Sequence, residues 1–113
     1  MSECVFCRIA AGELPADILH DDGEVLAFRD LQPQAPVHVL VIPRAHWDSL
    51  AAVPAGGEAV LGRLLGVCRD LAARLGLEAG HRVVVNTGAD GGQSVGHLHL
   101  HLLAGRALRW PPG

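Results

Sequence analysis

The residues with the clearest chemical potential lie at positions 97–103, in the run His-Leu-His-Leu-His-Leu-Leu. Strict alternation of polar and apolar residues has the period of a β-strand, so His97, His99 and His101 are predicted on one face and the leucines on the other. Histidine titrates near neutral pH, binds metal ions and serves as a nucleophile or a general acid and base. A solvent-facing strand normally mixes several polar residue types, so this pattern favours a functional site over a simple polar surface.

Two cysteines near the N-terminus, Cys4 and Cys7, form a second candidate. Two thiolates on a tight turn can bind one tetrahedral metal ion, although the pair alone fits two small buried residues equally well. The third cysteine, Cys68, falls on the apolar stripe of a predicted helix and is interpreted as packing. An odd number of cysteines fits metal binding in a reducing compartment, the cytoplasm, better than a disulfide framework.

A histidine in a buried strand and a glycine-rich loop are further candidates. Residues 37–42 are the most β-branched run and are predicted to form a central strand buried on both faces; His38 within it is either a hydrogen-bonded core residue or part of a site. Residues 87–96 contain four glycines, which let backbone amides approach a ligand closely. Gln93 and Ser94 add side-chain donors to this loop, which leads directly into the histidine run.

The pattern of apolar residues, glycines and prolines in the rest of the chain predicts the helices and strands that position these residues. A long helix is expected over residues 58–75, with Gly76 as its C-terminal cap and Leu65 among its core-facing leucines. Trp110, beside two prolines, is expected to pack against another surface. The fold class is therefore α+β in a single domain, residues 1–113, with a mostly antiparallel sheet of about five strands. The other predicted elements are a short helical turn at 4–12 and strands at 18–20, 25–30, 82–86 and 97–103.

Composition narrows the function classes. The chain has 113 residues, of which 50% are hydrophobic and 19% charged, as in a folded globular protein. Its net charge is −3 and it contains no lysine, which argues against nucleic acid and anionic membranes as partners. No apolar run approaches the roughly 20 residues of a spanning helix, and no signal-peptide pattern begins the chain.

The histidine run resembles the signature of the histidine-triad (HIT) family, in which three histidines alternate with apolar residues. Further stretches resemble the Hint branch of that family, nucleoside phosphoramidases that act as homodimers; they are residues 27–30, 34–38, 40–43, 90–95 and 110–113. The resemblance covers nearly the whole chain. It implies a HIT-like fold and hydrolysis of the P–N bond of purine nucleoside phosphoramidates to a nucleoside monophosphate and an amine, without an organic cofactor.

The resemblance also implies catalytic roles. His99, the middle histidine, is the expected nucleophile and forms a nucleotidyl-histidine that water then hydrolyses. His101 is expected to hold the phosphate oxygens or to protonate the leaving amine, and His38 to belong to the same histidine network. For the nucleotide, Asp30 is expected to bind the ribose hydroxyls, and Leu14, Phe28 and Leu31 to enclose the base. The phosphate end is expected to meet Ser94, Gln93, Gly92 and Asn86.

Many bacterial members resembling this sequence carry a structural zinc ion. The ligands implied here are Cys4, Cys7, His46 and His97, a set that suits tetrahedral zinc with all four positions filled. The sequence departs from many relatives at Gly96, where an aromatic residue usually precedes the triad. Two other functions stay open: hydrolysis of dinucleoside polyphosphates by the same His99, and a nucleotide-binding interaction module whose hydrolysis is incidental.

Overall fold

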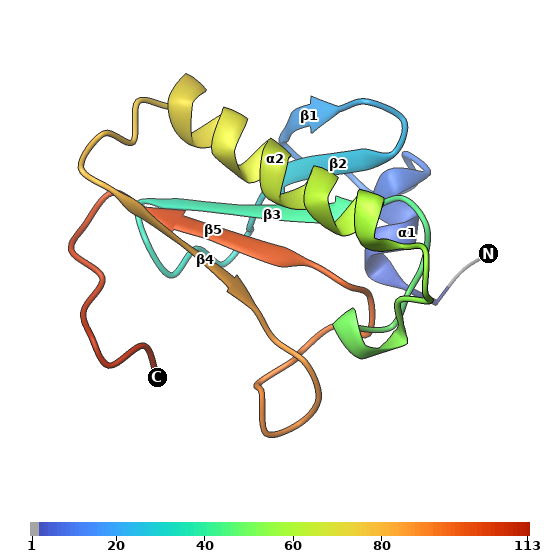
Figure 1. Ribbon diagram of the computed structural model, residues 1–113. Coiled ribbons are helices and arrows are strands. Elements are labelled where there is room, and N and C mark those ends of the chain that lie inside the picture. The colour runs from blue at the N-terminus through green and yellow to red at the C-terminus, as the bar shows by residue number, and fades with distance from the viewer. Residues whose placement is uncertain (1–2) are drawn as a thin grey trace.

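The computed structural model describes residues 3–113 and contains a five-stranded antiparallel sheet with the strand order β1-β2-β3-β5-β4 (Figure 1). This confirms the predicted α+β fold with one long helix and a short N-terminal helix. The elements in chain order are α1 (Val5–Ala10), β1 (Ile18–Asp21), β2 (Val25–Arg29), β3 (Val37–Pro43), the 3₁₀ turn η1 (Leu50–Ala52), α2 (Glu58–Arg74), β4 (His81–Val85) and β5 (Leu100–Ala104).

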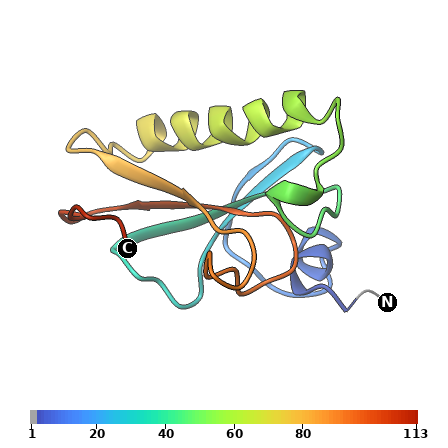
Figure 2. The same ribbon diagram turned by 60° about the horizontal axis from the view of Figure 1, so that its bottom comes forward.

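The two helices lie on opposite faces of the sheet, α2 on one and α1 on the other (Figure 2). Alternate residues of each strand therefore enter different cores. In β2, for example, Val25 and Ala27 join the core beneath α2, whereas Leu26 and Phe28 join the core beside α1. As predicted, β3 is buried on both faces, because it lies in the middle of the sheet between β2 and β5.

Helix α2 packs through a stripe that includes Leu64, Cys68 and Leu71, each at most 2% exposed. Burial raises the pKa of the Cys68 thiol to about 11, so this cysteine is an unreactive core residue, as predicted. The helix ends at Arg74, and Gly76 adopts a φ of +70°, a conformation that glycine readily takes after a helix. The expectation for Leu65 was wrong: its side chain is 55% exposed, on the flank of the helix rather than beneath it.

The histidine run enters the sheet later than its pattern predicted. Hydrogen-bonded pairing of β5 with β3 begins at Leu100, opposite Val41, so residues 97–99 lie outside the strand. One reason is that Pro43, farther along β3, has no N–H to donate to a ladder. The N–H of Leu98 instead donates to the carbonyl of Trp47 at 2.7 Å. The alternation of faces nevertheless continues, since Leu98 joins the core beneath α2.

The C-terminal tail is held by its backbone rather than by its aromatic side chain. The guanidinium of Arg82 donates to the carbonyls of Leu108 and Arg109, at 2.9 and 2.7 Å. Trp110 is 82% exposed, so the expected packing of this ring is not found within the chain. Among residues 3–113, no helix combines the length and the apolar character needed to cross a membrane.

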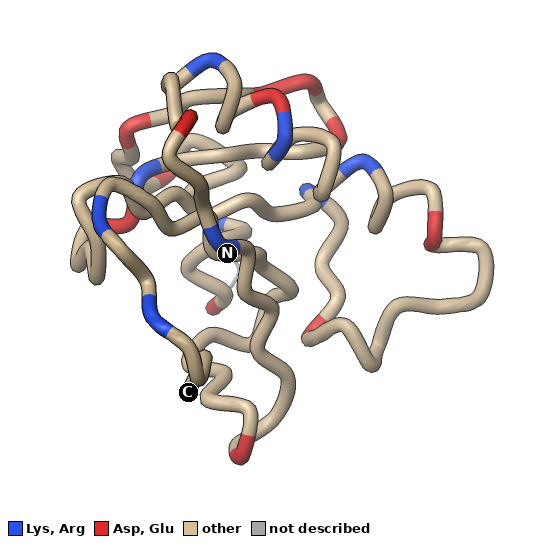
Figure 3. The backbone as a smooth tube through the Cα atoms, turned by 60° about the vertical axis from the view of Figure 1, so that its left-hand side comes forward, with Lys and Arg blue, Asp and Glu red and all other residues tan. Residues whose placement is uncertain are grey.

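Acidic and basic positions are interspersed along the backbone (Figure 3). One group of charges joins the β1–β2 turn to α2. The carboxylate of Asp22 accepts hydrogen bonds from His20 and Arg63 at 2.9 and 2.6 Å, and from the backbone N–H groups of Glu24 and Val25. The His20 hydrogen bond, followed by the two backbone bonds, holds the pKa of the Asp22 carboxyl well below its usual range.

We expect Asp22→Ala to lower the free energy of unfolding by about 1–2 kcal/mol, because several charge-assisted hydrogen bonds are lost together. Urea denaturation at pH 7 measures the change. Since the folded-state pKa is depressed, the contribution of Asp22 is complete above the usual Asp range and is lost as the pH falls toward the depressed value. Asp70→Ala, which removes an exposed carboxylate on α2, is the control; equal effects of the two substitutions would contradict the prediction.

Candidate functional site

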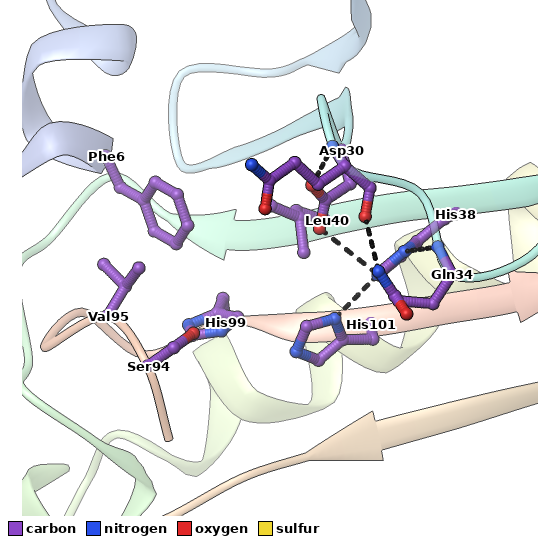
Figure 4. A pocket seen from close by; sticks show the side chains of 10 residues that line it. Phe6, Asp30, Gln34, His38, Leu40, Ser94, Val95, His99 and His101 are labelled. Carbon is purple, nitrogen blue, oxygen red and sulfur yellow. Dashed lines mark hydrogen bonds and ion pairs between the residues drawn. The ribbon is translucent and has the colours of Figure 1, made fainter. Parts of the chain in front are cut away.

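A cavity of about 340 Å³ opens on the face of the sheet that carries α1 (Figure 4). The histidine run, the N-terminal helix and the loops before β3 and β5 all contribute side chains to it. The lining residues are Phe6, Asp30, Gln32, Gln34, His38, Leu40, Ser94, Val95, His99 and His101. A second cavity, of about 130 Å³ and mostly apolar, adjoins it through the shared residues Phe6, Asp30 and Leu40 and also includes Phe28 and Leu31.

His99 is 3% exposed, and a hydrogen bond at one ring nitrogen fixes the orientation of its ring. Its Nδ1 lies 2.7 Å from the main-chain oxygen of His97. Because a carbonyl only accepts hydrogen bonds, Nδ1 carries the proton of the neutral ring, and Nε2 keeps its lone pair. The ring of Phe6 packs edge-on against His99 with 5.1 Å between centroids. In its neutral form, this buried imidazole presents an unprotonated Nε2 at the cavity, the arrangement that a nucleophilic histidine needs.

His38 and His101 are joined in a hydrogen-bonded series. The backbone N–H of Gln34 donates to Nδ1 of His38 at 3.0 Å, so the proton of a neutral His38 is on Nε2. That Nε2–H lies 2.8 Å from Nδ1 of His101 and 3.4 Å from a carboxylate oxygen of Asp30. Accepting at Nδ1 leaves His101 with its own proton on Nε2. The cavity wall therefore carries one imidazole acceptor, from His99, and one imidazole donor, from His101.

The protonation states needed for this series follow from burial. Desolvation, reinforced by the neighbouring His99 and His38, lowers the pKa of His101 to about 4. Desolvation also lowers the pKa of His38, against the opposing effect of the Asp30 carboxylate. Both rings are accordingly neutral at pH 7, which is the condition for each to have one donor and one acceptor nitrogen.

Several residues predicted to bind a nucleotide do lie at these cavities. Asp30 is 22% exposed; one of its oxygens accepts from the backbone N–H of Gln32 at 2.9 Å, and the other faces His38. Ser94 is exposed at the mouth of the larger cavity. Phe28 lies in the wall of the apolar cavity, and Leu31, which is 86% exposed, lies at its edge. A cavity with mixed polar and apolar walls thus shares wall residues with a mostly apolar one.

Other predicted residues lie outside both cavities and shape the loop that follows β4. The side-chain N–H₂ of Gln93 donates to the main-chain oxygens of Asp48 and Val95, at 2.6 and 3.0 Å. Asn86 donates to the main-chain oxygen of Gly91 at 2.7 Å. A Cβ at Gly91 would lie 2.3 Å from the oxygen of Thr87, so this close approach of two backbone segments requires glycine. Leu14 and Gly92 likewise lie outside the two cavities.

The sequence analysis missed five residues that line the larger cavity, namely Phe6, Gln32, Gln34, Leu40 and Val95. Phe6 had a possible signal, since it lies between the two cysteines of a candidate metal site. The role of Gln34 is played by its backbone N–H, which no residue-type pattern reveals.

The two cysteines converge with two histidines in one cluster. The potential ligand atoms of Cys4, Cys7, His46 and His97 all lie within 4.8 Å of one another. Nδ1 of His97 is 3.1 Å from Nδ1 of His46, and the sulfur–nitrogen separations are 3.3 Å for Cys4–His97, 3.3 Å for Cys7–His46 and 3.6 Å for Cys7–His97. Tetrahedral zinc with ordinary bond lengths requires about 3.3 Å between two nitrogens and about 3.6 Å between sulfur and nitrogen.

The outer nitrogens of the two histidines show which atoms face the centre of this cluster. Nε2 of His97 donates to the main-chain oxygen of Pro43 at 2.9 Å, and Nε2 of His46 donates to the carboxylate of Asp48 at 2.8 Å. Both neutral rings therefore direct an unprotonated Nδ1 inward, as metal ligation requires, and each outer bond is of the kind that orients a metal-binding histidine. The four residues fit a tetrahedral metal ion.

A second group of potential ligands, Asp30, His38 and His101, is less suited to a metal. The Nε2 atom that His38 directs toward the other two carries a proton, because Nδ1 accepts from Gln34. Metal binding there would require His38 to change tautomer and to lose that backbone hydrogen bond.

Comparison with known proteins agrees with this geometry. The HIT domain family matches residues 11–108. A maize relative described as a 14 kDa zinc-binding protein is 46% identical, over 99% of this chain and 89% of its own. The crystal structure of a HIT family hydrolase from Legionella pneumophila has a TM-score of 0.95 and 46% identity, covering 98% of this chain and 100% of its own.

A further solved structure, described as a histidine triad nucleotide-binding protein from Candida albicans, has a TM-score of 0.83 and 33% identity. It covers 96% of this chain, which in turn covers 83% of it. The match over residues 11–108 includes the complete histidine run, and the fold agrees with that of the Legionella protein over 98% of this chain. This chain belongs to the HIT family.

Proposed function

We propose that this protein hydrolyses purine nucleoside phosphoramidates at the P–N bond, with residues 1–113 acting as one domain. The observation that carries the proposal is the 2.7 Å hydrogen bond from Nδ1 of His99 to the His97 carbonyl, which leaves Nε2 as a nucleophilic lone pair at a cavity. The relatives support the class of reaction: the Legionella protein is described as a hydrolase and the Candida protein as nucleotide-binding.

The proposed chemistry has two steps. Nε2 of His99 attacks the α-phosphorus, the P–N bond breaks, and its electron pair leaves with the amine nitrogen, which takes a proton. His101, whose Nε2 carries a proton, either supplies that proton or donates a hydrogen bond to the phosphate oxygens. Water then attacks the phosphorus and the bond to His99 breaks, which releases a nucleoside monophosphate. The proton that the water loses restores Nε2–H of His101 if that ring protonated the amine; if the amine took its proton from solvent, the proton returns to solvent. Such transfers depend on positioning and charge stabilisation, which the fixed imidazoles provide.

The nucleotide would lie across the two connected cavities. Its base would enter the apolar cavity beside Phe28 and Leu31, and its ribose hydroxyls would donate to the Asp30 carboxylate. Its phosphate would approach Ser94 and the backbone of the glycine-rich loop. In this arrangement Gln93 and Asn86 act by shaping the loop through the contacts described above, rather than by contacting phosphate.

We further propose that the cluster of Cys4, Cys7, His46 and His97 holds a structural zinc ion. All four tetrahedral positions are supplied by the protein, so the ion would offer no position to a substrate. The maize relative is itself described as zinc-binding. Thiolate ligands of this kind are maintained in a reducing compartment, which favours the cytoplasm.

Finally, we propose a two-fold homodimer. Strand β4 is at the edge of the sheet, and exposed apolar residues on this strand and on the flank of α2 include Val85 and Leu65, 37% and 55% exposed. An edge strand with neighbouring apolar surface can be covered by the same surface of a second copy. The exposed Trp110 would then lie near the cavity of the partner subunit.

His99→Ala should reduce hydrolysis of adenosine 5′-phosphoramidate by several orders of magnitude while AMP still binds, because the nucleophile is removed and the cavities remain. Steady-state kinetics and calorimetry measure the two effects. His20→Ala, at a histidine of the opposite edge strand β1 that lines neither cavity, should retain activity. Phosphoramidase activity of His99→Ala within tenfold of wild type would exclude the proposed nucleophile, and faster turnover of a diadenosine polyphosphate would favour that substrate class instead.

The purified protein should contain one zinc ion per chain by elemental analysis. Cys7→Ser should lower that content and the midpoint of thermal unfolding, because a ligand is lost, whereas Cys68→Ala should leave the zinc content unchanged. If metal-free protein has the same heat stability and activity as zinc-containing protein, the four residues serve only in packing.

Light scattering should give a mass near twice 11.9 kDa. Removing the residues after Leu108 should change selectivity among phosphoramidates more than stability, because the tail makes few core contacts. A monomer at micromolar concentration, or unchanged selectivity after truncation, would contradict this interface.

A further inference from the structure

The metal cluster and the cavity share three segments of chain. We propose that the residues of the Cys4, Cys7, His46 and His97 cluster position the His99 imidazole and the wall of the base cavity, so that metal and nucleotide strengthen each other's binding. This inference rests on the proposed function in assuming that a nucleotide occupies the cavity and that the cluster holds a metal ion. It assigns the cluster a positioning role in addition to holding the N-terminal turn on the sheet.

The first connection runs through His97. This residue is fully buried, and its side chain is fixed between the cluster, through Nδ1, and the Pro43 carbonyl, through Nε2. Its own main-chain oxygen accepts the Nδ1–H of His99 at 2.7 Å. Any movement of the His97 backbone therefore alters the hydrogen bond that determines both the tautomer and the direction of the His99 ring.

The second connection runs through Phe6, which lies between the two cysteines in sequence and is 6% exposed. Its ring is edge-on to His99 at 5.1 Å and to Phe28 at 5.5 Å between centroids, and it lines both cavities. The short helix α1 has only six residues and so has little stability by itself. Ligation of the cysteines on both sides of Phe6 would hold this ring against the nucleophile.

The third connection runs through Asp48 and Gln93. The Asp48 carboxylate accepts from His46, and the Asp48 main-chain oxygen accepts from the Gln93 side chain at 2.6 Å. Gln93 also donates to the oxygen of Val95, a residue of the cavity wall. The segment that orients a cluster histidine is thereby tied to the loop beside the proposed phosphate position, the loop whose Ser94 and Val95 side chains are drawn in Figure 4.

These connections imply a coupling free energy. Metal in the cluster would order the same backbone segments that nucleotide binding requires to be ordered. Whichever of the two ligands binds second therefore has less of the chain to order, and binds more tightly. Reciprocity then requires each ligand to raise the affinity of the other by the same factor. A metal ion that only fastened the N-terminal turn would leave nucleotide affinity unchanged in protein that stays folded.

The test compares AMP affinity, by calorimetry, in zinc-loaded protein and in protein stripped by a chelator. We expect stripped protein to bind AMP about tenfold more weakly, within the usual range of such couplings. Competition with a chromophoric chelator should show zinc affinity rising by the same factor at saturating AMP. Circular dichroism confirms that the stripped protein is folded.

Phe6→Leu and Phe28→Leu form a matched pair, since both truncate a ring of the base cavity but only Phe6 is flanked by cluster cysteines. Both substitutions should weaken AMP binding. Phe6→Leu should also bring the AMP affinities of zinc-loaded and stripped protein closer together, so that their ratio falls toward one. Phe28→Leu should leave that ratio unchanged. An equal effect of both substitutions on that ratio would remove Phe6 from the proposed connection.

If the stripped protein unfolds, cobalt-loaded protein replaces it. Saturating AMP should shift the visible absorption bands of cobalt in wild type and in Phe28→Leu, and should shift them less in Phe6→Leu; an unchanged wild-type spectrum would overturn the inference. In folded stripped protein, AMP affinities within twofold of each other would also overturn it while leaving the proposed function intact. Failure of AMP to bind zinc-loaded protein would overturn both.

Discussion

The pleat of the extended chain over residues 97–102 is the constraint on which the rest of the structure depends. It directs Leu98, Leu100 and Leu102 into the core beneath α2 and the three histidines to the opposite face. A slip of one residue would bury three imidazoles in an aliphatic core and put leucines at the cavity. The core beneath α2 therefore specifies the register of the histidines, although it contains none of the groups that could do chemistry.

Hydrogen bonds to the backbone then decide what each histidine can do. The carbonyl of His97 fixes the proton of His99 on Nδ1, and the carbonyl of Pro43 fixes that of His97 on Nε2. His97 and His99, on the same face of this extended segment, thus present different nitrogens. His99 directs Nε2 toward the cavity, and His97 directs Nδ1 toward the cluster. Identical side chains acquire different roles because their backbone partners differ, and the partners are rigid because they belong to the sheet or its immediate continuation.

Much of this architecture could be predicted because its signals are local. The β-branched run of β3, the helical period of α2 and the alternation of the histidine run each depend on one stretch of chain, and the structure contains all three elements. The expectation for Leu65 failed because apolar character alone does not say whether a side chain faces its own core or the surface. The late start of β5 at Leu100 reflects Pro43 and Trp47, which are distant from it in sequence.

The residues of the candidate site could likewise be predicted only in part from the sequence. Residue type and spacing were enough to select the three histidines of residues 97–101, His38 and the two N-terminal cysteines, whereas Asp30 and His46 were selected through the resemblance to the HIT family. Residue type and spacing could not reveal Phe6 as part of the cavity wall, nor Gln93 as a brace between loops, because both roles depend on tertiary contacts with His99 and Asp48. Proton positions could not be predicted either, since they depend on which backbone group faces each ring.

The amide that fixes the His38 tautomer belongs to the main chain of Gln34, whose side chain separately contributes to the cavity wall. Nineteen of the twenty amino acids supply that amide, and only proline lacks it. Position 34 can therefore change its size, charge or polarity without disturbing the proton arrangement of His38 and His101. Substrate range can diversify at this wall, by evolution or by design, while the catalytic chemistry stays the same.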